Sequence, residues 1–110
     1  MSGIDASSRA LYVGLRCYNS AVRVTRRYIV SGRVQGVGFR MFAADCARRE
    51  GLSGHVSNRP DGSVDAVVEG DLDGVARFEA ALWRGPSRAR VEAVDVTDTA
   101  PLGLTAFAIR

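Results

Sequence analysis

The 110-residue sequence has no lysine, one histidine and two cysteines. All fifteen basic residues are therefore arginines. Together with abundant alanine, this indicates a genomic composition bias, so most of the arginines need no functional explanation. The cysteines, Cys17 and Cys46, are too few for a disulfide framework, and with one histidine and no Cys-x-x-Cys pair they leave no structural zinc site. We expect Cys46 to be a small core residue on the apolar face of a helix.

Long apolar runs are also absent. The longest run near the N-terminus, residues 10–15, is too short to span a membrane and marginal for a signal peptide. Residues 1–25 are rich in arginine and serine and poor in acids, which is also typical of an organellar transit peptide. We favour a flexible leader that results from a start codon placed upstream of the true one. The expected folded domain therefore spans residues 26–110. We expect the protein to be cytoplasmic.

The net charge of +3 is unevenly distributed along the chain. Residues 1–27 hold five arginines and one aspartate, whereas residues 28–110 hold ten arginines and eleven acids. The folded part therefore lacks the basic bias of a duplex-binding protein. An RNA-recognition module would carry stacking aromatic residues on a central strand, but residues 64–70 contain none and include two acids. We expect no nucleic-acid partner and no membrane partner.

From Arg27 onward the hydrophobic periodicity predicts alternating strands and helices in one small domain. The expected strands cover residues 28–34, 52–58, 64–70, 91–96 and, as a short addition, 105–109. The expected helices are Phe39–Glu50, closed by Gly51, and a second one that begins near Asp71 or Asp73 and ends at Trp83. Their apolar faces are Phe39, Phe42, Ala43, Cys46 and Ala47 in the first, and Leu72, Val75, Phe78 and Leu82 in the second. The order β-α-β-β-α-β predicts an α+β, ferredoxin-like sandwich with two helices on one face of an antiparallel sheet.

A short glycine loop joins the first strand to the first helix, and Arg40 follows it. Glycines 36 and 38 allow backbone N–H groups to converge on one point, and such groups at a helix N-terminus bind anions. The guanidinium of Arg40 can hold two oxygens of one phosphate. This pattern predicts a site for a small phosphate or carboxylate, although a tight turn beside a solvated arginine remains an alternative. The glycine spacing is neither that of a dinucleotide-binding loop nor that of a P-loop.

The residues from Gly32 to Arg40, Gly-Arg-Val-Gln-Gly-Val-Gly-Phe-Arg, resemble the phosphate-loop signature of the acylphosphatase family. A second motif of that family is Gly-x-Val-x-Asn followed by a turn and Asp-Gly-x-Val. The segment Gly54–Val64 matches it, with Asn58 at the asparagine position. The resemblance extends from about Arg27 to Arg110.

The resemblance implies an enzyme that hydrolyses small acyl phosphates to a carboxylate and inorganic phosphate. It implies that Arg40 binds the phosphoryl group and that Asn58 orients the attacking water, rather than only satisfying the backbone of a turn. The phosphate cradle would act mainly through backbone N–H groups of Gln35, Gly36, Val37, Gly38 and Phe39. No carboxylate cluster accompanies the two motifs, so we expect no metal. We also expect no cofactor, and we expect the protein to be a monomer.

Three positions depart from the commonest family pattern. His55 stands where an aromatic residue, usually tryptophan, is common, Ser57 where a basic residue is common, and Gly38 where phenylalanine is frequent. The first two adjoin Asn58 and are expected to alter substrate affinity. Arg33, with the turn residues, is expected to be solvated.

Two other functions remain open from the sequence. The first is a non-catalytic ferredoxin-like module that binds a phosphorylated metabolite. The second is a stand-alone homologue of the acylphosphatase-like domain in carbamoyl-phosphate-handling maturation factors. A residue placed to hold a water against the bound phosphorus would favour the enzyme over the binding module.

Overall fold

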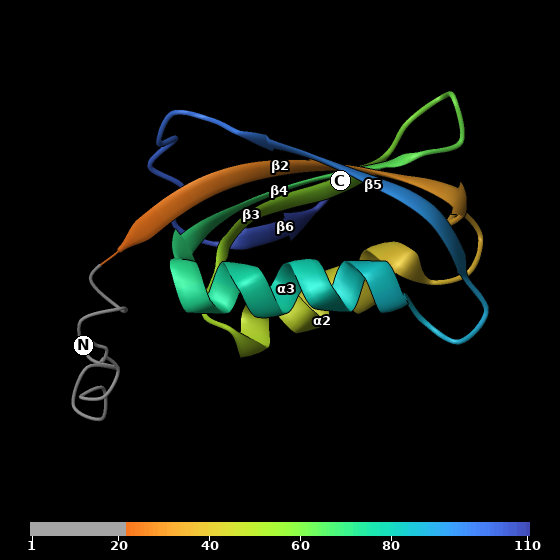
Figure 1. Ribbon diagram of the computed structural model, residues 1–110, viewed down its shortest axis with the longest axis horizontal. Coiled ribbons are helices and arrows are strands. Elements are labelled where there is room, and N and C mark those ends of the chain that lie inside the picture. Colours follow the sequence, from red (N-terminus) through yellow and green to blue (C-terminus); the bar gives the residue numbers. More distant parts are fainter. Residues whose placement is uncertain (1–21) are drawn as a thin grey trace, which may run out of the picture.

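The computed structural model describes residues 22–110. Residues 1–21, which include Cys17 and most of the expected leader, lie outside the described part. The elements follow in the order β2 (Arg23–Arg33), α2 (Phe39–Arg49), β3 (Ser53–Asn58), β4 (Val64–Asp71), α3 (Leu72–Arg84), β5 (Arg90–Asp98) and β6 (Phe107–Ile109) (Figure 1). The predicted order of strands and helices is confirmed.

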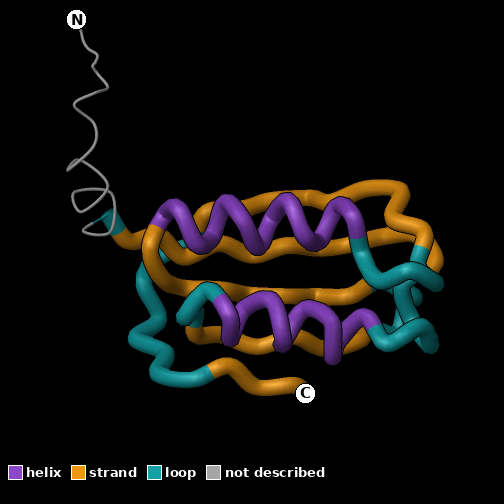
Figure 2. Tube along the Cα trace, turned by 90° about the horizontal axis from the view of Figure 1, so that it is seen from below, coloured by secondary structure: helices purple, strands orange, loops and turns teal. Residues whose placement is uncertain are grey.

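The strands form one five-stranded sheet in the order β5-β2-β4-β3-β6. Both helices lie side by side on one face of this sheet (Figures 1 and 2). This is the predicted ferredoxin-like arrangement, with one difference: β6 pairs parallel to β3, whereas the other three pairings are antiparallel. After β5 the chain crosses to the opposite edge of the sheet before β6 begins. Strand β6 therefore runs parallel to its neighbour β3, and this makes the sheet mixed.

The helices divide the sheet between them. Helix α2 packs mainly on β3 and β6, and α3 packs on β2, β4 and β5. The predicted apolar faces are buried, apart from Phe42 and Leu72, which are half-buried. Phe78 of α3 contacts the ring of Tyr28 at a centroid distance of 5.8 Å and that of Phe107 at 6.4 Å. Aromatic contacts of this kind connect the first strand, the second helix and the last strand in one core.

The structure has both of these predicted helix ends, but their hydrogen bonds differ. At the end of α2, Leu52 N donates to Ala47 O and Gly51 N to Arg48 O, at 2.9 and 3.1 Å. These two bonds form the Schellman closure typical of a glycine just after a helix, so Gly51 ends the helix as predicted. At the start of α3, Asp71 occupies the N-cap position, but its side chain makes no capping hydrogen bond.

The boundary expected between residues 25 and 26 falls inside β2. The strand begins at Arg23, and residues 23–25 pair with residues 69–71 of β4. Thr25 is only 5% exposed, and its Oγ1 donates to Glu69 Oε2 at 2.7 Å. The sequence missed this start because arginines interrupt the apolar alternation of the strand. The folded domain therefore begins at least three residues before the predicted boundary.

The connection between β5 and β6 crosses the sheet face that the helices leave open. Glu69, on the central strand β4, accepts hydrogen bonds from Leu102 N and Leu104 N at 2.8 and 2.9 Å. The carboxylate of Glu69 thus anchors the connection to the central strand, near the end of that strand. Within residues 22–110, no helix is long and apolar enough to cross a membrane.

Candidate active site

Three strand ends and one helix start meet at the same end of the sheet. Strands β2 and β3 both run antiparallel to β4, and β6 runs parallel to β3. The C-terminal ends of β2, β3 and β6 therefore point in one direction. The loop that leaves β2 crosses to the start of α2, which lies over β3. The topology thus brings the predicted glycine loop, Arg40 and Asn58 into one place.

The loop adopts the left-handed conformation that its glycines permit. Gly36 has φ 74° and Gly38 has φ 79°, values that residues with a Cβ adopt at a cost. Gly38 is the N-cap of α2, and Phe42 N donates to Gly38 O at 3.0 Å. The N–H groups of residues 39–41 precede this first helical bond and are directed toward the loop. No acidic side chain lies in the first turn to compete for them.

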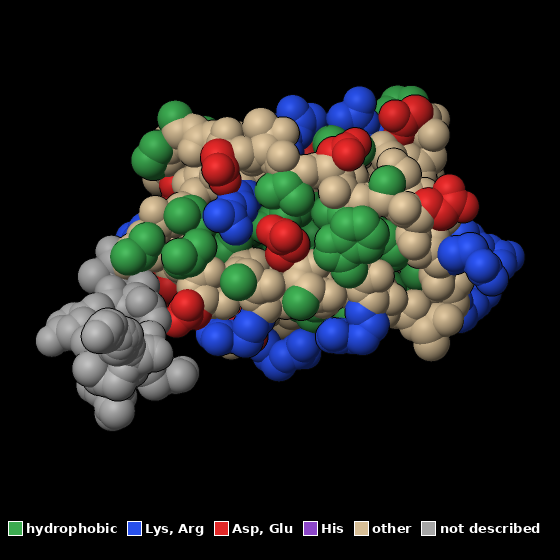
Figure 3. All heavy atoms as spheres, in the orientation of Figure 1, with side chains coloured by type: hydrophobic (Ala, Val, Ile, Leu, Met, Phe, Trp, Pro, Cys, Tyr) green, Lys and Arg blue, Asp and Glu red, His purple; other side chains and the backbone are tan. Residues whose placement is uncertain are grey.

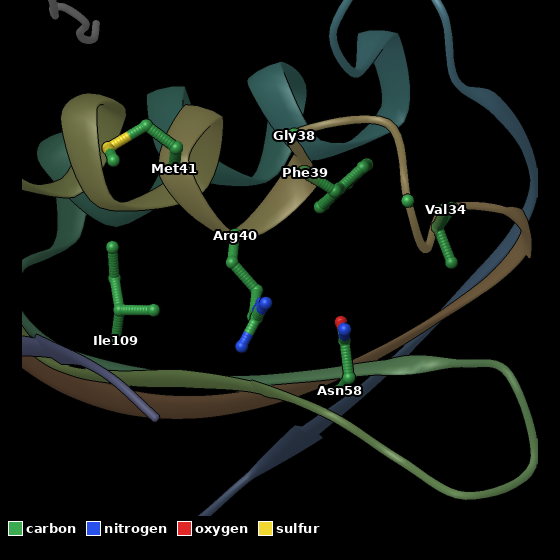
Figure 4. Close-up of a pocket in the computed structure, with 8 residues that line it drawn as sticks. Val34, Gly38, Phe39, Arg40, Met41, Asn58 and Ile109 are labelled. Carbon is green, nitrogen blue, oxygen red and sulfur yellow. The ribbon is translucent and has the colours of Figure 1, made fainter.

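Arg40 extends from the first turn of α2 toward the sheet (Figure 4). Its Nη1 donates to the main-chain oxygen of Arg110 at 2.9 Å, which fixes the guanidinium on one side. An arginine side chain has five N–H donors, so several remain for a ligand. Within residues 22–110, no aspartate or glutamate forms a salt bridge with Arg40, so no acidic side chain there neutralises its charge.

Asn58 is the last residue of β3, and its amide projects from the strand into the same space that the guanidinium of Arg40 enters from the helix (Figure 4). Among the described residues, the side chain of Asn58 makes no hydrogen bond. The alternative interpretation, an asparagine that satisfies the backbone of the following turn, is therefore not what the structure shows. Asp61 does this instead, because its Oδ1 accepts from Ser63 N at 2.9 Å and from Ser63 Oγ at 2.6 Å. These bonds lower the pKa of the Asp61 carboxyl.

The side chain of Gln35 holds the glycine loop against the β3–β4 turn. Its Nε2 donates to Arg59 O at 2.7 Å and to Ser63 O at 2.9 Å. The sequence placed Gln35 in the phosphate cradle through its backbone. The structure adds that its amide positions the loop relative to the strand end that carries Asn58.

His55 and Ser57 lie on the opposite face of β3 from Asn58. Side chains alternate between the two faces of a strand, and Val56, between them, is fully buried under the helices. Neither residue lines the cavity beside Asn58. No direct contact with that cavity therefore supports the expected effect of His55 and Ser57 on substrate affinity. Burial lowers the pKa of His55, and the nearby charge of Arg110 lowers it further.

The residues at this end of the sheet enclose a cavity of about 200 Å³, which we call the loop pocket. It is lined by Val34, Gly36, Gly38, Phe39, Arg40, Met41, Asn58 and Ile109. Of the seven site residues predicted from the sequence, five line the loop pocket, whereas Gln35 and Val37 lie outside it. Three lining residues were not predicted as site residues. Val34 was expected only as part of a strand, and nothing in a lone methionine or in the last strand indicates where Met41 and Ile109 will lie. Arg40 is the only charged side chain in the lining.

No three histidine, cysteine, aspartate or glutamate side chains come together as a possible metal site within residues 22–110. The expectation of a reaction without a metal stays a prediction. The arrangement itself offers a cationic guanidinium, a helix N-terminus and a free amide around a small cavity. These groups can bind a phosphoryl group and hold a water beside it.

Comparison with known proteins agrees with this geometry. A family model described as Acylphosphatase matches residues 26–109. The chain is 50% identical over 91 residues to an acylphosphatase of Anaeromyxobacter dehalogenans, covering 82% of this chain and 98% of that protein.

Solved structures show the same likeness. The crystal structure of acylphosphatase from Bacillus subtilis superposes with a TM-score of 0.77 and 39% identity, covering 79% of this chain and 98% of the other. A crystal structure of full-length HypF in a phosphate- and nucleotide-bound form superposes with a TM-score of 0.74 and 25% identity. That match covers 81% of this chain and 12% of HypF.

Proposed function

Because this chain belongs to the acylphosphatase family and is accordingly a hydrolase of acyl phosphates, we propose that the loop pocket is its active site. The observation that carries this proposal is the approach of Arg40 and Asn58 to one cavity from separate elements. Asn58 has its amide available there, while other residues satisfy the turn that follows it. The substrate is a small acyl phosphate, and the products are a carboxylate and inorganic phosphate.

Arg40 and the backbone N–H groups of the loop and helix start bind the non-bridging oxygens of the phosphoryl group. These donors are fixed before the substrate arrives, so they stabilise the charge of the transition state without reorganising. Phosphoryl transfer passes through a loose transition state in which positioning and charge stabilisation supply most of the acceleration. A carboxylate is a good leaving group, so no further acid is needed to expel it.

Asn58 binds the attacking water through its amide and directs it at phosphorus. The water oxygen forms a new bond to phosphorus, and the bond between phosphorus and the acyl oxygen breaks with its electron pair on the carboxylate. One water proton passes to a phosphate oxygen of the substrate, because no other base lines the loop pocket. The balance is one acyl phosphate and one water to one carboxylate and one inorganic phosphate.

The comparisons favour this reaction over the two alternatives. The chain is 39% identical to the Bacillus subtilis acylphosphatase, which it matches along 98% of that protein, and 25% identical to the part of HypF that it matches. A free-standing phosphate-binding module would not require an amide opposite the guanidinium. We therefore retain the hydrolase, and we keep a monomeric state and a cytoplasmic location as predictions.

Release of inorganic phosphate from benzoyl phosphate tests the proposal. We expect the purified protein to catalyse this release with EDTA present, because the residues proposed to act are all protein groups. Inorganic phosphate should inhibit as a competitive product. If the protein binds phosphate but releases none from benzoyl phosphate, the non-catalytic module is correct instead.

A further inference from the structure

A second cavity lies on the other side of the glycine loop, at the β5 edge of the sheet. It measures about 470 Å³, and Arg33, Arg88 and Arg90 lie in its lining, so we call it the arginine pocket. Figure 3 shows arginine side chains projecting from the end of the molecule where β2 ends and β5 begins. The residues 28–110 carry one more acid than arginine. A local group of three arginines is therefore not a reflection of the average charge.

The three arginines of this pocket differ from most others in the described part of the chain. Five of the other ten described arginines pair with acids, as Arg27 does with Asp65 and Arg77 does with Glu50, and three more donate a side-chain hydrogen bond. Within residues 22–110, Arg33, Arg88 and Arg90 make no side-chain hydrogen bond and no salt bridge. Glu92, the acid closest in sequence to Arg88 and Arg90, is exposed and forms no salt bridge with any of the three. Their charges are left for a ligand or for solvent.

The sheet register increases the electrostatic cost of this arrangement. Arg33 and Arg90 are direct partners across the antiparallel β2–β5 ladder. Two like charges directly opposite each other destabilise a strand pair. An anion bound between them would remove the repulsion, and the hydroxyl of Ser87, which also lines the cavity, supplies a further donor.

The arginine pocket and the loop pocket share Gly36. A Cβ built on Gly36 would meet no atom within 4 Å, so Gly36 borders open space where it lines both cavities. Gly36 is thus the residue over which one bound molecule would pass from the loop pocket to the arginine pocket.

We propose that the arginine pocket is a subsite for a second negative charge on the substrate. The inference rests on the proposed function: the phosphoryl group enters the loop pocket, and a carboxylate or second phosphate on the acyl group binds Arg33, Arg88 and Arg90. The preferred substrates are then acyl phosphates that carry another anionic group remote from the bond that breaks. Such a group adds binding energy without touching the reacting atoms.

The test compares benzoyl phosphate with 4-carboxybenzoyl phosphate, which differ by one remote carboxylate. At low ionic strength, kcat/KM should be higher for the carboxylated substrate. Arg88→Gln and Arg90→Gln should each reduce this preference by about three- to fivefold, in the range of exposed charge pairs, and leave benzoyl phosphate turnover unchanged. Salt should reduce the preference in the parent protein, because exposed charges are screened.

Arg84→Gln is the matched control. It removes the same charge from the last turn of α3, from an exposed arginine that does not line the arginine pocket. The inference is overturned if the parent, Arg88→Gln and Arg84→Gln all show the same preference for the carboxylated substrate. Long-range electrostatic attraction would then explain the whole preference. Calorimetric binding of 4-carboxybenzylphosphonate and benzylphosphonate gives the same comparison without turnover. Absence of benzoyl phosphate turnover would contradict the hydrolase, whereas equal binding of the two phosphonates would contradict the subsite alone. The two failures are therefore distinguishable.

Discussion

At the scale of single residues, Arg40 is proposed to supply the charge of the site and Asn58 the direction of attack. Arg40→Ala removes the only charged side chain that lines the loop pocket. We expect both inhibition by inorganic phosphate and turnover of benzoyl phosphate to be lost. Arg40→Lys should recover little, because an ammonium cannot reproduce the planar fork of a guanidinium or its bond to Arg110 O. A lysine variant with near-parent kinetics would show that charge alone suffices.

Asn58→Ala should separate catalysis from binding. The variant keeps the loop, the helix start and Arg40, so phosphate inhibition and KM should stay close to those of the parent. Turnover should fall by about 10²-fold or more, as expected when a reacting group is misplaced. Ser57→Ala is the matched control, because Ser57 precedes Asn58 on β3 and faces away from the cavity. If Asn58→Ala turns over at the parent rate, the water-orienting function is wrong.

The sequence predicted Arg40 and Asn58 through two motifs, but it could not predict the contacts that hold them. Gln35 donates to the backbone of residues 24 and 28 positions away, and Arg40 donates to a residue 70 positions away. Such contacts depend on which strands become neighbours, and a local pattern does not contain that information. The faces of His55 and Ser57 follow from strand alternation once the register of β3 is known.

At the scale of elements, the glycine loop requires a left-handed backbone at Gly36. Gly36→Val should weaken phosphate inhibition and lower turnover together, because a β-branched residue resists φ 74°. Gly36→Asn is the control, since asparagine tolerates this conformation and the space for a Cβ is open. We expect the asparagine variant to bind phosphate more tightly than the valine variant. Equal phosphate affinity in the two variants and the parent would show that this backbone conformation is not needed for the cradle.

The β5–β6 connection depends on one buried carboxylate. Hydrogen bonds from Thr25 Oγ1 and from Leu102 N and Leu104 N lower the pKa of Glu69 below its ordinary value of 4.5. A lowered pKa in the folded state adds stability above about pH 4.5, and this stability is lost as the pH falls through the folded-state value. Glu69→Gln should therefore lower the Tm at pH 7 and make the Tm less dependent on pH below 4.5.

Glu92→Gln is the control for this prediction. Glu92 is exposed on β5 and forms no salt bridge among the residues that the structure describes. Its replacement should therefore leave the pH dependence of the Tm below pH 4.5 unchanged. Thermal unfolding of both variants between pH 3 and pH 7 provides the comparison. Parallel Tm profiles for Glu69→Gln and the parent would contradict the proposed anchor.

Periodicity predicted the elements better than it predicted their ends. The faces of α2 and α3 were clear because apolar residues recur at helical spacing. The start of β2 was missed because its exposed face carries Arg23 and Arg27. The direction of β6 was also not predictable, because it depends on a connection that crosses the sheet and is held by Glu69. That anchor joins residues 33 and 35 positions apart.

At the scale of the whole molecule, binding and anchoring lie at opposite ends of the sheet. Strand β2 has 11 residues, which corresponds to roughly 35 Å between its start and its end. The loop pocket and the arginine pocket lie at the end of the strand. Thr25 and Glu69 lie near its start. Changes near the start should therefore affect stability more than turnover, because neither the loop pocket nor the arginine pocket has a lining residue there.

Two truncations test this separation. Deleting residues 1–21 leaves β2 complete, whereas deleting residues 1–25 removes three residues paired with β4 and the Thr25–Glu69 hydrogen bond. A buried hydrogen bond contributes about 1 kcal/mol, and in a domain of this size each kcal/mol shifts the Tm by roughly 4–8 °C. We expect the shorter protein to unfold several degrees below the longer one, with kcat on benzoyl phosphate equal in both. Equal Tm values would show that residues 23–25 add nothing to the sheet, and loss of turnover in the longer protein would show that residues 1–21 contribute to the active domain.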